Sequence, residues 1–166
     1  MKNNFFIALL LGVLALSSCE KEGFGPLSDS PAAIPVTVSN VFDYRPRPTV
    51  QASKAANLIK IDLEIPATSG RTIKEITRVA AAAGGNFAPI RDSATVKSTG
   101  LYSLTPIAGN GTKVSFSTTF TDYKAKVAAT ADPASNALLA RDFYFRLTLD
   151  NGDIIYPESV RVWVVD

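Results

Sequence analysis

Histidine is absent from the 166-residue chain, and cysteine, methionine and tryptophan occur only once each. Without histidine the chain has no Ser-His-Asp or Cys-His catalytic group and no imidazole metal ligand, and one cysteine cannot form a disulfide within the chain. Charged residues are also few and nearly balanced, with 17 Lys and Arg against 15 Asp and Glu. This balance gives no electrostatic reason to expect a nucleic-acid partner.

The remaining composition favours a folded protein. Hydrophobic residues make up 46% of the chain and charged residues 19%, while glycine and proline occur ten times each. These proportions argue against wholesale disorder and against a collagen-like repeat. The length suits one domain of ordinary size with one sizeable core.

A 12-residue apolar run, Phe5 to Leu16, follows Lys2 near the start of the chain. It is shorter than the roughly 20 residues of a transmembrane helix, so a secretory signal peptide is favoured over a membrane span. Two serines then precede the lone Cys19. The quartet LSSC at residues 16–19 resembles the lipobox of bacterial lipoproteins, in which the cysteine receives a diacylglycerol and becomes the N-terminus after cleavage.

This resemblance implies that residues 1–18 are a lipoprotein signal peptide and that Cys19 holds the protein to a membrane by two or three acyl chains. The alternative is an ordinary secreted protein whose cysteine falls here by chance. Glu20–Glu22 (EKE) resembles the surface-export signal of Bacteroidetes lipoproteins, or is simply the charged start of a tether. Residues 23–33 have the Gly, Pro and Ser composition of a linker. We therefore expect a lipidated tether over 19–33 and a folded domain over 34–166.

Alternation of apolar and polar residues predicts strands in three segments. The clearest is 58–65 (LIKIDLEI), and the same pattern returns over 112–120 and 143–149. In the last segment the expected inward residues are Phe143, Phe145, Leu147 and Leu149, and the outward ones are Tyr144, Arg146 and Thr148. Residues 34–41 form a plausible opening strand.

The third strand runs into the sequence DNGD at residues 150–153. Asn151 and Gly152 suit the two positive-φ positions of a type I′ turn, so we expect a hairpin that returns through 154–156 and continues over 160–165. Pro157 interrupts this return strand. Because proline has no N–H to donate, it predicts a bulge or an edge position there.

Two segments leave helix and strand open. Residues 72–83 (TIKEITRVAAAA) have a helical capping pattern, yet β-branched residues alternate through their first half, which favours a strand over 72–80. Residues 121–131 suit either a short helix capped by Asp122 or an irregular crossover.

Many short strands, frequent turns and little helix predict an all-β fold, an antiparallel β-sandwich for which an immunoglobulin-like Greek key is the most economical form. A lipobox, a tether and a β-rich domain closed by the hairpin FYFRLTLDNGDIIYPESVRVWVVD resemble the small lipoproteins of Bacteroidetes. The resemblance implies an immunoglobulin-type or fibronectin-type module at the outer membrane, on either side of it, and some such modules assist glycan uptake. It implies no particular activity.

Carboxylate pairs are the only candidates for catalysis or metal binding. Asp62 and Glu64 share one strand face and could serve a hydrolase, although they alternate with Lys60 on what looks like a solvent face. Asp150 and Asp153 could clamp Ca²⁺, but turn chemistry explains them better. We therefore predict no enzymatic activity, no metal and no cofactor.

Aromatic residues near the hairpin are the better binding candidates. Tyr144, Tyr156 and Trp163 could form a flat platform for a sugar or a protein partner, and the alternative is that Trp163 belongs to the core. Residues 45–48 (RPRP) carry two positive charges that could meet an acidic partner, or form an exposed connection. Ser93, in Asp92–Ala94, resembles an O-glycosylation acceptor of Bacteroidetes.

The sequence thus predicts a lipid-anchored extracytoplasmic β-sandwich that serves as a binding or structural module of the cell envelope. Its expected partners are the membrane, through Cys19, and an envelope protein or glycan, without nucleic acid. One alternative is a carbohydrate- or protein-binding accessory of a nutrient-uptake complex. Another is a carboxylate-dependent hydrolase.

Overall fold

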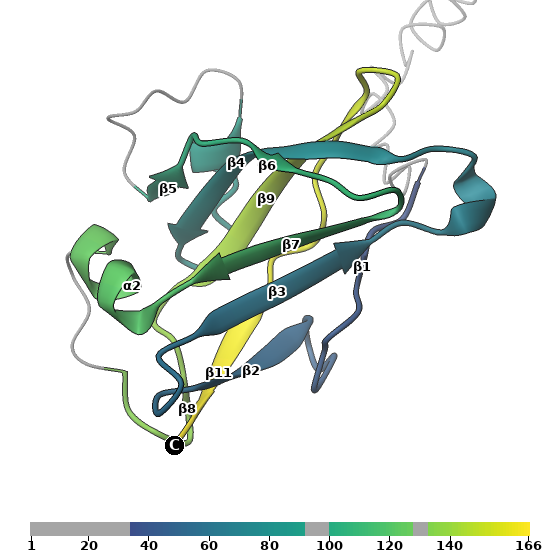
Figure 1. Ribbon diagram of the computed structural model, residues 1–166. Coiled ribbons are helices and arrows are strands. Elements are labelled where there is room, and N and C mark those ends of the chain that lie inside the picture. The colour runs from purple at the N-terminus through teal and green to yellow at the C-terminus, as the bar shows by residue number, and fades with distance from the viewer. Residues whose placement is uncertain (1–33, 92–99, 128–132) are drawn as a thin grey trace, which may run out of the picture. The chain divides into compact units, whose positions relative to one another are not determined.

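The computed structural model describes residues 34–91, 100–127 and 133–166 (Figure 1). The predicted signal peptide, the tether with Cys19, and Ser93 lie outside the described residues. Across the described ranges, no helix is long and apolar enough to cross a membrane.

The described strands form three small sheets (Figure 1). The first sheet has the order β1 (Thr37–Val38), β3 (Ile59–Glu64) and β7 (Lys113–Thr118). The second has the order β10 (Ile154–Ile155), β9 (Asp142–Leu149), β4 (Ile73–Ala82) and β5 (Leu101–Ser103), and β6 (Ile107–Ala108) also pairs with β4. The third has the order β2 (Thr49–Ser53), β11 (Arg161–Val165) and β8 (Ala137–Leu138).

The alternating pattern of residues 58–65 produces the expected strand β3. Ile59, Ile61 and Leu63 are buried, whereas Lys60 is exposed on the opposite face. The strand pairs in antiparallel register with β7, so that Ile61 lies opposite the buried Phe116. A strand with one buried face and one solvated face results, as in the layers of a β-sandwich.

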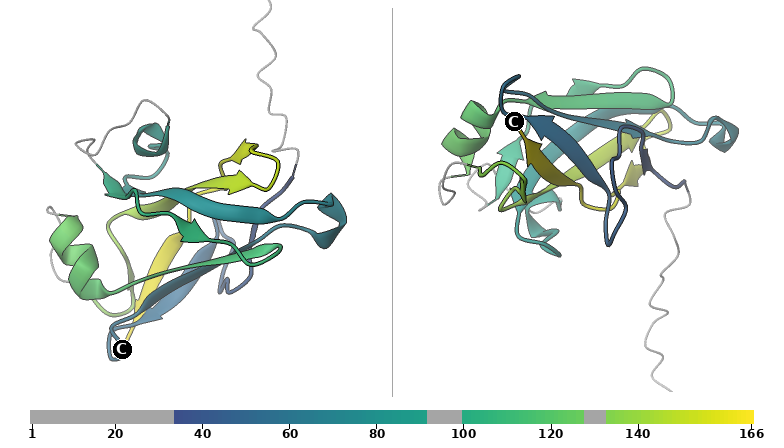
Figure 2. Two further views of the ribbon diagram at one scale, coloured as in Figure 1. Left: turned by 45° about the horizontal axis from the view of Figure 1, so that its top comes forward. Right: turned by 90° about the horizontal axis from the view of Figure 1, so that it is seen from below.

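The core lies between the layers and is rich in aromatic rings. Phe116 from β7 packs against Phe143 and Phe145 of β9, with ring centroids 5.3 and 5.5 Å apart. Tyr102 of β5 adds edge-to-face contacts with Phe116 and Phe143. Figure 2 shows these two sheets from two further directions, with the β2–β11 pair beside them. The aromatic cluster therefore joins the first sheet to the second.

The ambiguous segment 72–83 is a strand. β4 pairs with β9 along most of its length, from Ile73 opposite Leu149 to Ala82 opposite Asp142. Its β-branched residues and small alanines suit a central strand whose second half, residues 79–82, is buried on both faces, and burial in the sheet outweighs the helical capping pattern. The preference for strand over helix is confirmed.

The hairpin between β9 and β10 forms, but its turn differs from the expected type I′. Thr148 lies opposite Ile154, which leaves a three-residue loop between the paired Leu149 and Asp153. Gly152 donates its N–H to the Leu149 carbonyl at 3.0 Å and has φ +88°, whereas Asn151 is not at positive φ. The turn is therefore type I followed by a glycine in the left-handed region, which needs only one positive-φ residue.

Pro157 marks the bulge that its sequence position predicts. Ile155 lies opposite Leu147, but Val160 lies opposite Phe143, so the return strand contains one extra residue between these pairs. Past Val160 the chain leaves β9. β11 then pairs in parallel with β2 and antiparallel with β8.

Two element boundaries also differ from expectation. The opening strand is only Thr37–Val38 within the expected 34–41, and the strand expected over 112–120 ends at Thr118. A short helix, α2 (Phe120–Lys126), follows, and its N-cap is Thr119 rather than Asp122: the Asp122 N–H donates to Thr119 Oγ1 at 2.9 Å.

The all-β sandwich is confirmed, with antiparallel pairing everywhere except between β2 and β11 in the described part of the chain. That parallel pair joins a strand near the start of the domain to the last strand. An immunoglobulin-like identity stays a prediction.

Candidate binding site

Tyr144 is fully buried, so the expected exposed position of this ring is wrong. Its side chain does point away from the main core, but residues 87–90 cover that face of the sheet. The Phe87 ring meets it edge-to-face at 4.8 Å, and the Tyr144 hydroxyl donates to the Ala83 carbonyl at 2.9 Å. Tyr144 therefore serves a small second core with Ala80, Ala82 and Ile90.

Trp163 is partly exposed on the outer face of the sheet formed by β2, β11 and β8. It lies opposite Gln51 on one side and opposite Leu138, 40% exposed, on the other. Its neighbours Val162 and Val164 point to the core. The alternative that Trp163 is the core tryptophan is therefore wrong, and its outward position is confirmed.

The three aromatic candidates do not share a face. Tyr144 is in β9 of the second sheet, whereas Trp163 is in the third sheet, because the chain changes partners after Val160. Tyr156 is 39% exposed directly after β10. The expected platform of Tyr144 with Trp163 is thus wrong, and Trp163 is left with Leu138 and Gln51 as its lateral neighbours.

A pocket of about 330 Å³ lies at one end of the sandwich. Its walls come from the β2–β3 turn and from α2, with a contribution from Pro133. The lining residues are Lys54, Asn57, Phe120, Thr121, Lys124 and Pro133. Among the described residues, its lining contains two lysines and no acidic side chain.

Backbone hydrogen bonds position the β2–β3 turn. Ser53 lies opposite Leu58, and the Asn57 N–H donates to the Lys54 carbonyl at 3.0 Å. The Lys54 N–H donates to the carbonyl of Val165 at 2.8 Å, which ties the turn to the end of β11. Asn57 has φ +49°, a left-handed conformation that asparagine tolerates better than most residues.

The Asn57 side chain joins this turn to the helix. Its Oδ1 accepts the Phe120 backbone N–H at 3.1 Å, and its Nδ2 donates to Thr121 Oγ1 at 3.3 Å. Asn57 thereby satisfies one of the N–H groups that the first turn of a helix leaves without an intrahelical partner. The two walls of the pocket are held together by one side chain.

Packing of α2 decides which of its residues face the pocket. Phe120 and Tyr123 are buried in the domain, and Lys126 places its ammonium 4.5 Å from the centroid of the Tyr102 ring. Thr121 and Lys124, three positions apart, therefore share a different side of the helix.

Burial raises the pKa of Tyr123 to about 12, so this core tyrosine stays neutral at physiological pH.

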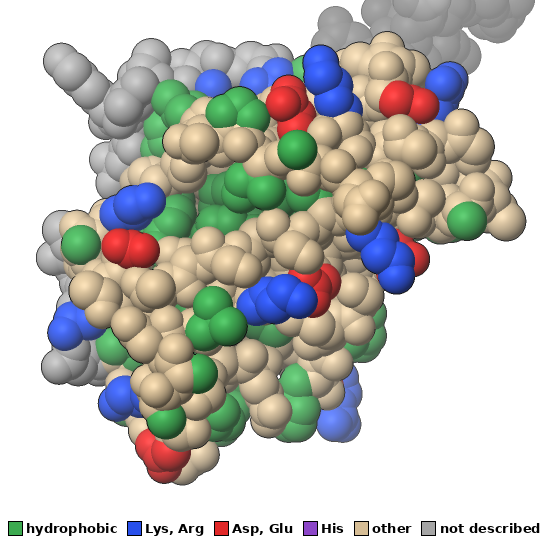
Figure 3. Space-filling view, in the orientation of Figure 1, with side chains coloured by type: hydrophobic (Ala, Val, Ile, Leu, Met, Phe, Trp, Pro, Cys, Tyr) green, Lys and Arg blue, Asp and Glu red, His purple; other side chains and the backbone are tan. Residues whose placement is uncertain are grey.

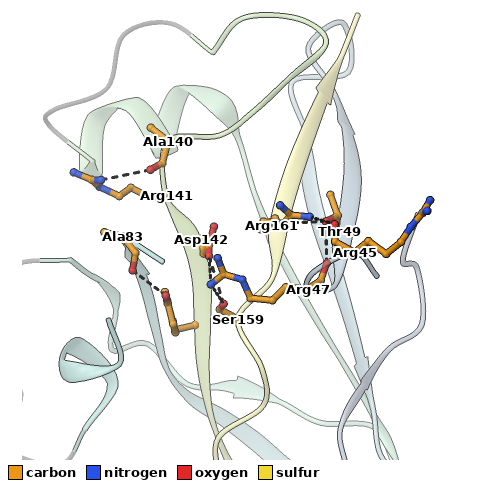
Figure 4. A network of polar contacts seen from close by, with 10 residues as sticks. Arg45, Arg47, Thr49, Ala83, Ala140, Arg141, Asp142, Ser159 and Arg161 are labelled. Carbon is orange, nitrogen blue, oxygen red and sulfur yellow. Dashed lines mark hydrogen bonds and ion pairs between the residues drawn. The ribbon is translucent and has the colours of Figure 1, made fainter. Parts of the chain in front are cut away.

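A polar network ties the 39–48 connection to β9 and β11 (Figure 4). Arg47 forms an ion pair of 2.8 Å with Asp142 and donates to Ser159 Oγ at 3.1 Å. Arg161 donates to Thr49 Oγ1 at 3.2 Å and to the Arg45 carbonyl at 2.6 Å. Arg47 is thus turned into the domain, whereas the Arg45 side chain is 92% exposed and lies 3.4 Å from Asp43 Oδ1.

The carboxylates on β3 are held by neighbouring polar groups. Asp62 accepts from Lys60 Nζ at 2.9 Å and from Ser115 Oγ at 2.5 Å, and Glu64 lies 3.5 Å from Lys113 Nζ. Burial works to raise the pKa of Asp62, but the hydrogen bonds from Lys60 and Ser115 outweigh it and lower the pKa. Asp62 is therefore an ionised acceptor on a polar strand face.

The acidic residues of the hairpin turn satisfy the turn itself. Asp150 Oδ1 accepts the Asn151 N–H at 3.0 Å, and Asp153 Oδ2 accepts from the Asn151 side-chain amide at 2.6 Å. In the described ranges, no three His, Cys, Asp or Glu side chains are grouped so that they could hold a metal ion.

No protein-family model matches the chain, and a search of curated proteins gives no significant match.

Sequence reasoning missed the pocket because the lining residues of the β2–β3 turn and those of α2 are 63 to 70 residues apart along the chain. The distance from Asn57 to Phe120 in sequence gives no sign that the two meet. One usable signal was the asparagine at the end of a short polar turn before a strong strand, a position where its side chain often caps neighbouring backbone.

Proposed function

We propose that the chain is a lipid-anchored, extracytoplasmic β-sandwich of the bacterial cell envelope that works by binding a small ligand. The pocket between the β2–β3 turn and α2 is the observation that carries the binding role. Its volume is at the lower end of the range of small-molecule sites, and its polar lining groups belong to a hydrogen-bonded frame.

The lipid anchor rests on the sequence. The lone cysteine follows an apolar run and two serines at the position that the lipobox requires, and the tether that follows has linker composition. This pattern supports membrane attachment through Cys19 and, by its resemblance to Bacteroidetes lipoproteins, a location at the outer membrane.

A second candidate is a contact with a glycan or an envelope protein through the outer face of the third sheet. Trp163, Leu138 and Gln51 lie side by side there, and an aromatic ring between an apolar and an amide side chain suits either partner. In this form the module would be an accessory of a nutrient-uptake complex.

Labelling with radioactive palmitate tests the anchor. We expect label on the wild-type chain expressed in a lipoprotein-processing bacterium, no label on Cys19→Ala, and accumulation of the precursor under globomycin. Ser18→Ala is the matched control, because small residues are all that the preceding position needs. Label that persists on Cys19→Ala, or its absence from the wild type, would refute the anchor.

A further inference from the structure

We infer, on the basis of the proposed lipid anchor, that Phe42, Tyr44 and Arg45 form a surface that contacts the phospholipids of the membrane (the Phe42–Arg45 surface). It is the face of the domain that meets the bilayer. Three properties of the segment support this contact: the exposure of its two rings, its rigid attachment to the fold and its closeness along the chain to the anchor.

The local backbone turns the two rings of this surface toward water. Val41 packs against the core and Asp43 lies opposite Thr49, so the residues on either side of Asp43 point away from the domain. Phe42 is 60% exposed and Tyr44 is 54% exposed, the two highest values among the large hydrophobic side chains of the described residues. Because both rings stay in water in the folded chain, a partner that covers them gains the free energy of their burial.

Hydrogen bonds to the fold hold this segment in place. The Phe42 N–H donates to the Thr49 carbonyl at 2.7 Å, and the Thr49 N–H donates to the Asp43 carbonyl at 2.7 Å. The Tyr44 hydroxyl donates to the Val38 carbonyl at 3.4 Å. A fixed backbone thus presents both rings, which reduces the entropy lost on binding.

The chemistry of the surface suits the boundary between lipid headgroups and acyl chains. Phenylalanine supplies an apolar ring, and tyrosine combines a ring with a hydroxyl group that can stay among the headgroups. Figure 4 shows the Arg45 side chain extending away from the contacts of Arg47 and Arg161. Asp43 Oδ1 lies 3.4 Å from Arg45 Nε, so this ion pair has no net charge and the rings supply the attraction.

The small area of the surface favours a partner that is already held nearby. Two aromatic side chains bury at most about 300–500 Å² together, well below the roughly 1,000 Å² of a stable protein–protein interface. Residues 19–33 connect the proposed anchor to Ile34, where the described domain begins, and a chain of this length spans at most about 50 Å. Val38, which accepts from Tyr44, follows shortly after Ile34. The anchor therefore keeps the surface at a high effective concentration near the bilayer.

Fluorescence quenching by brominated lipids tests this contact. The mature acylated chain is placed in vesicles of phosphatidylethanolamine and phosphatidylglycerol, and Trp163→Phe removes the native tryptophan. Phe42→Trp then puts an indole in the surface, where we expect it to lie about 5–10 Å into the headgroup boundary and to lose about half of its fluorescence to brominated acyl chains. Tyr44→Trp is a second reporter with the same expected result.

Tyr156→Trp in the same Trp163→Phe background is the matched control, because Tyr156 is an aromatic residue 39% exposed directly after β10, in a different sheet. Its indole should not be quenched. Tyr44→Ser, added to the Phe42→Trp reporter, should reduce the quenching because one of the two rings is lost, whereas Tyr156→Ser should leave it unchanged. Added NaCl should have little effect.

Absence of quenching at positions 42 and 44, or equal quenching at positions 42 and 156, would overturn the inference. Thermal unfolding checks that each variant is folded, which we expect because the substituted side chains at 42 and 44 are exposed. A chain that takes up palmitate but is not quenched keeps the anchor and loses the surface. If the wild type takes up no palmitate, coupling Cys19 to a maleimide phospholipid attaches the chain at the same position, so that quenching still tests the surface.

Discussion

Asp62 shows how a single side chain on a solvated strand face contributes to stability. Its carboxylate accepts hydrogen bonds from Lys60 and Ser115, and the Asn40 side chain accepts its backbone N–H at 2.9 Å. These bonds connect β3 both to β7 and to the segment after β1. The lowered pKa of Asp62 means that its ionised carboxylate is more stable in the folded chain than in the unfolded chain.

Asp62→Asn should lower the free energy of unfolding at pH 7 by about 0.5–1 kcal/mol, a value kept small by solvent screening of a partly exposed group. Because the folded pKa lies below the ordinary value of 3.8, this contribution is fully present above pH 3.8 and is lost as the pH falls through the folded pKa. Urea unfolding of both proteins at pH 7 and at pH 3 measures the difference.

Glu64→Gln is the control, because Glu64 is on the same face but has a longer contact with its lysine, at 3.5 Å. It should have the smaller effect at pH 7. An Asp62→Asn penalty that stays constant between pH 7 and pH 3 would contradict the role given to the Asp62 carboxylate.

The sequence correctly predicted on which side of its strand each aromatic side chain lies. It did not predict whether another segment of the chain covers that side chain. Alternation placed Tyr144 and Trp163 outward from the core, and both directions are right. An outward side chain is exposed to water only if no other segment packs on it. Residues 87–90, which cover Tyr144, are far from β9 along the chain. Periodicity contains no information on such a distant cover, so Tyr144 was misplaced and Trp163 was not.

Among the elements, the long connection between β1 and β2 depends on the Arg47–Asp142 ion pair. Asp142 is 11% exposed at its side chain, and Arg47 is its close cationic partner. Burial raises the pKa of Asp142, an effect that the charges of Arg47 and Arg161 and the Ser159 hydrogen bond reduce without cancelling. Arg47 thus compensates for a desolvated charge at the start of β9.

Arg47→Ala should destabilise the fold by about 1–3 kcal/mol at pH 7, because it leaves the Asp142 carboxylate without its cation. Because the pKa of Asp142 is raised in the folded chain, the folded chain takes up this proton at a higher pH than the unfolded chain does. The destabilising negative charge of Asp142 is therefore neutralised as the pH falls toward 3.8. The penalty of Arg47→Ala should therefore shrink in acid. Chemical denaturation between pH 7 and pH 4 measures this trend.

Arg45→Ala is the matched arginine control, because the Arg45 side chain is 92% exposed and should change stability little. A penalty for Arg47→Ala that grows as the pH falls would contradict the assignment of Asp142 as the group that needs the cation.

The hairpin shows what short sequence signals specify at this scale. DNGD and Pro157 correctly predicted a reversal and a bulge, because glycine frees the backbone and proline restricts it at its own position in the chain. The turn type depended on loop length, which is set by how Leu149 and Asp153 pair across the strands. That pairing is a property of the two strands together and not of the two turn residues.

For the whole molecule, composition and alternation were enough to predict an all-β sandwich. They could not predict that the last strand leaves its hairpin partner and pairs in parallel with β2. Figure 3 shows a hollow with apolar side chains between β7 and the strands β4 and β6, where the first and second sheets diverge. Such divergence depends on the packing of Phe116, Phe143 and Phe145 between layers, a long-range property that local pattern does not encode.

The same argument explains why the sequence indicated the anchor and missed the pocket. The apolar run, the two serines and Cys19 are adjacent in sequence, so their pattern is visible without a fold. Lys54, Asn57 and Lys124 come together only when the β2–β3 turn meets α2.

Mass spectrometry of the mature protein extracted from membranes tests the account most directly. We predict an N-terminal peptide that begins at a Cys19 carrying two or three acyl chains, followed by the unmodified EKE sequence. A mature chain that retains residues 1–18, or that begins at an unacylated residue, would contradict the lipid-anchored module proposed for this protein.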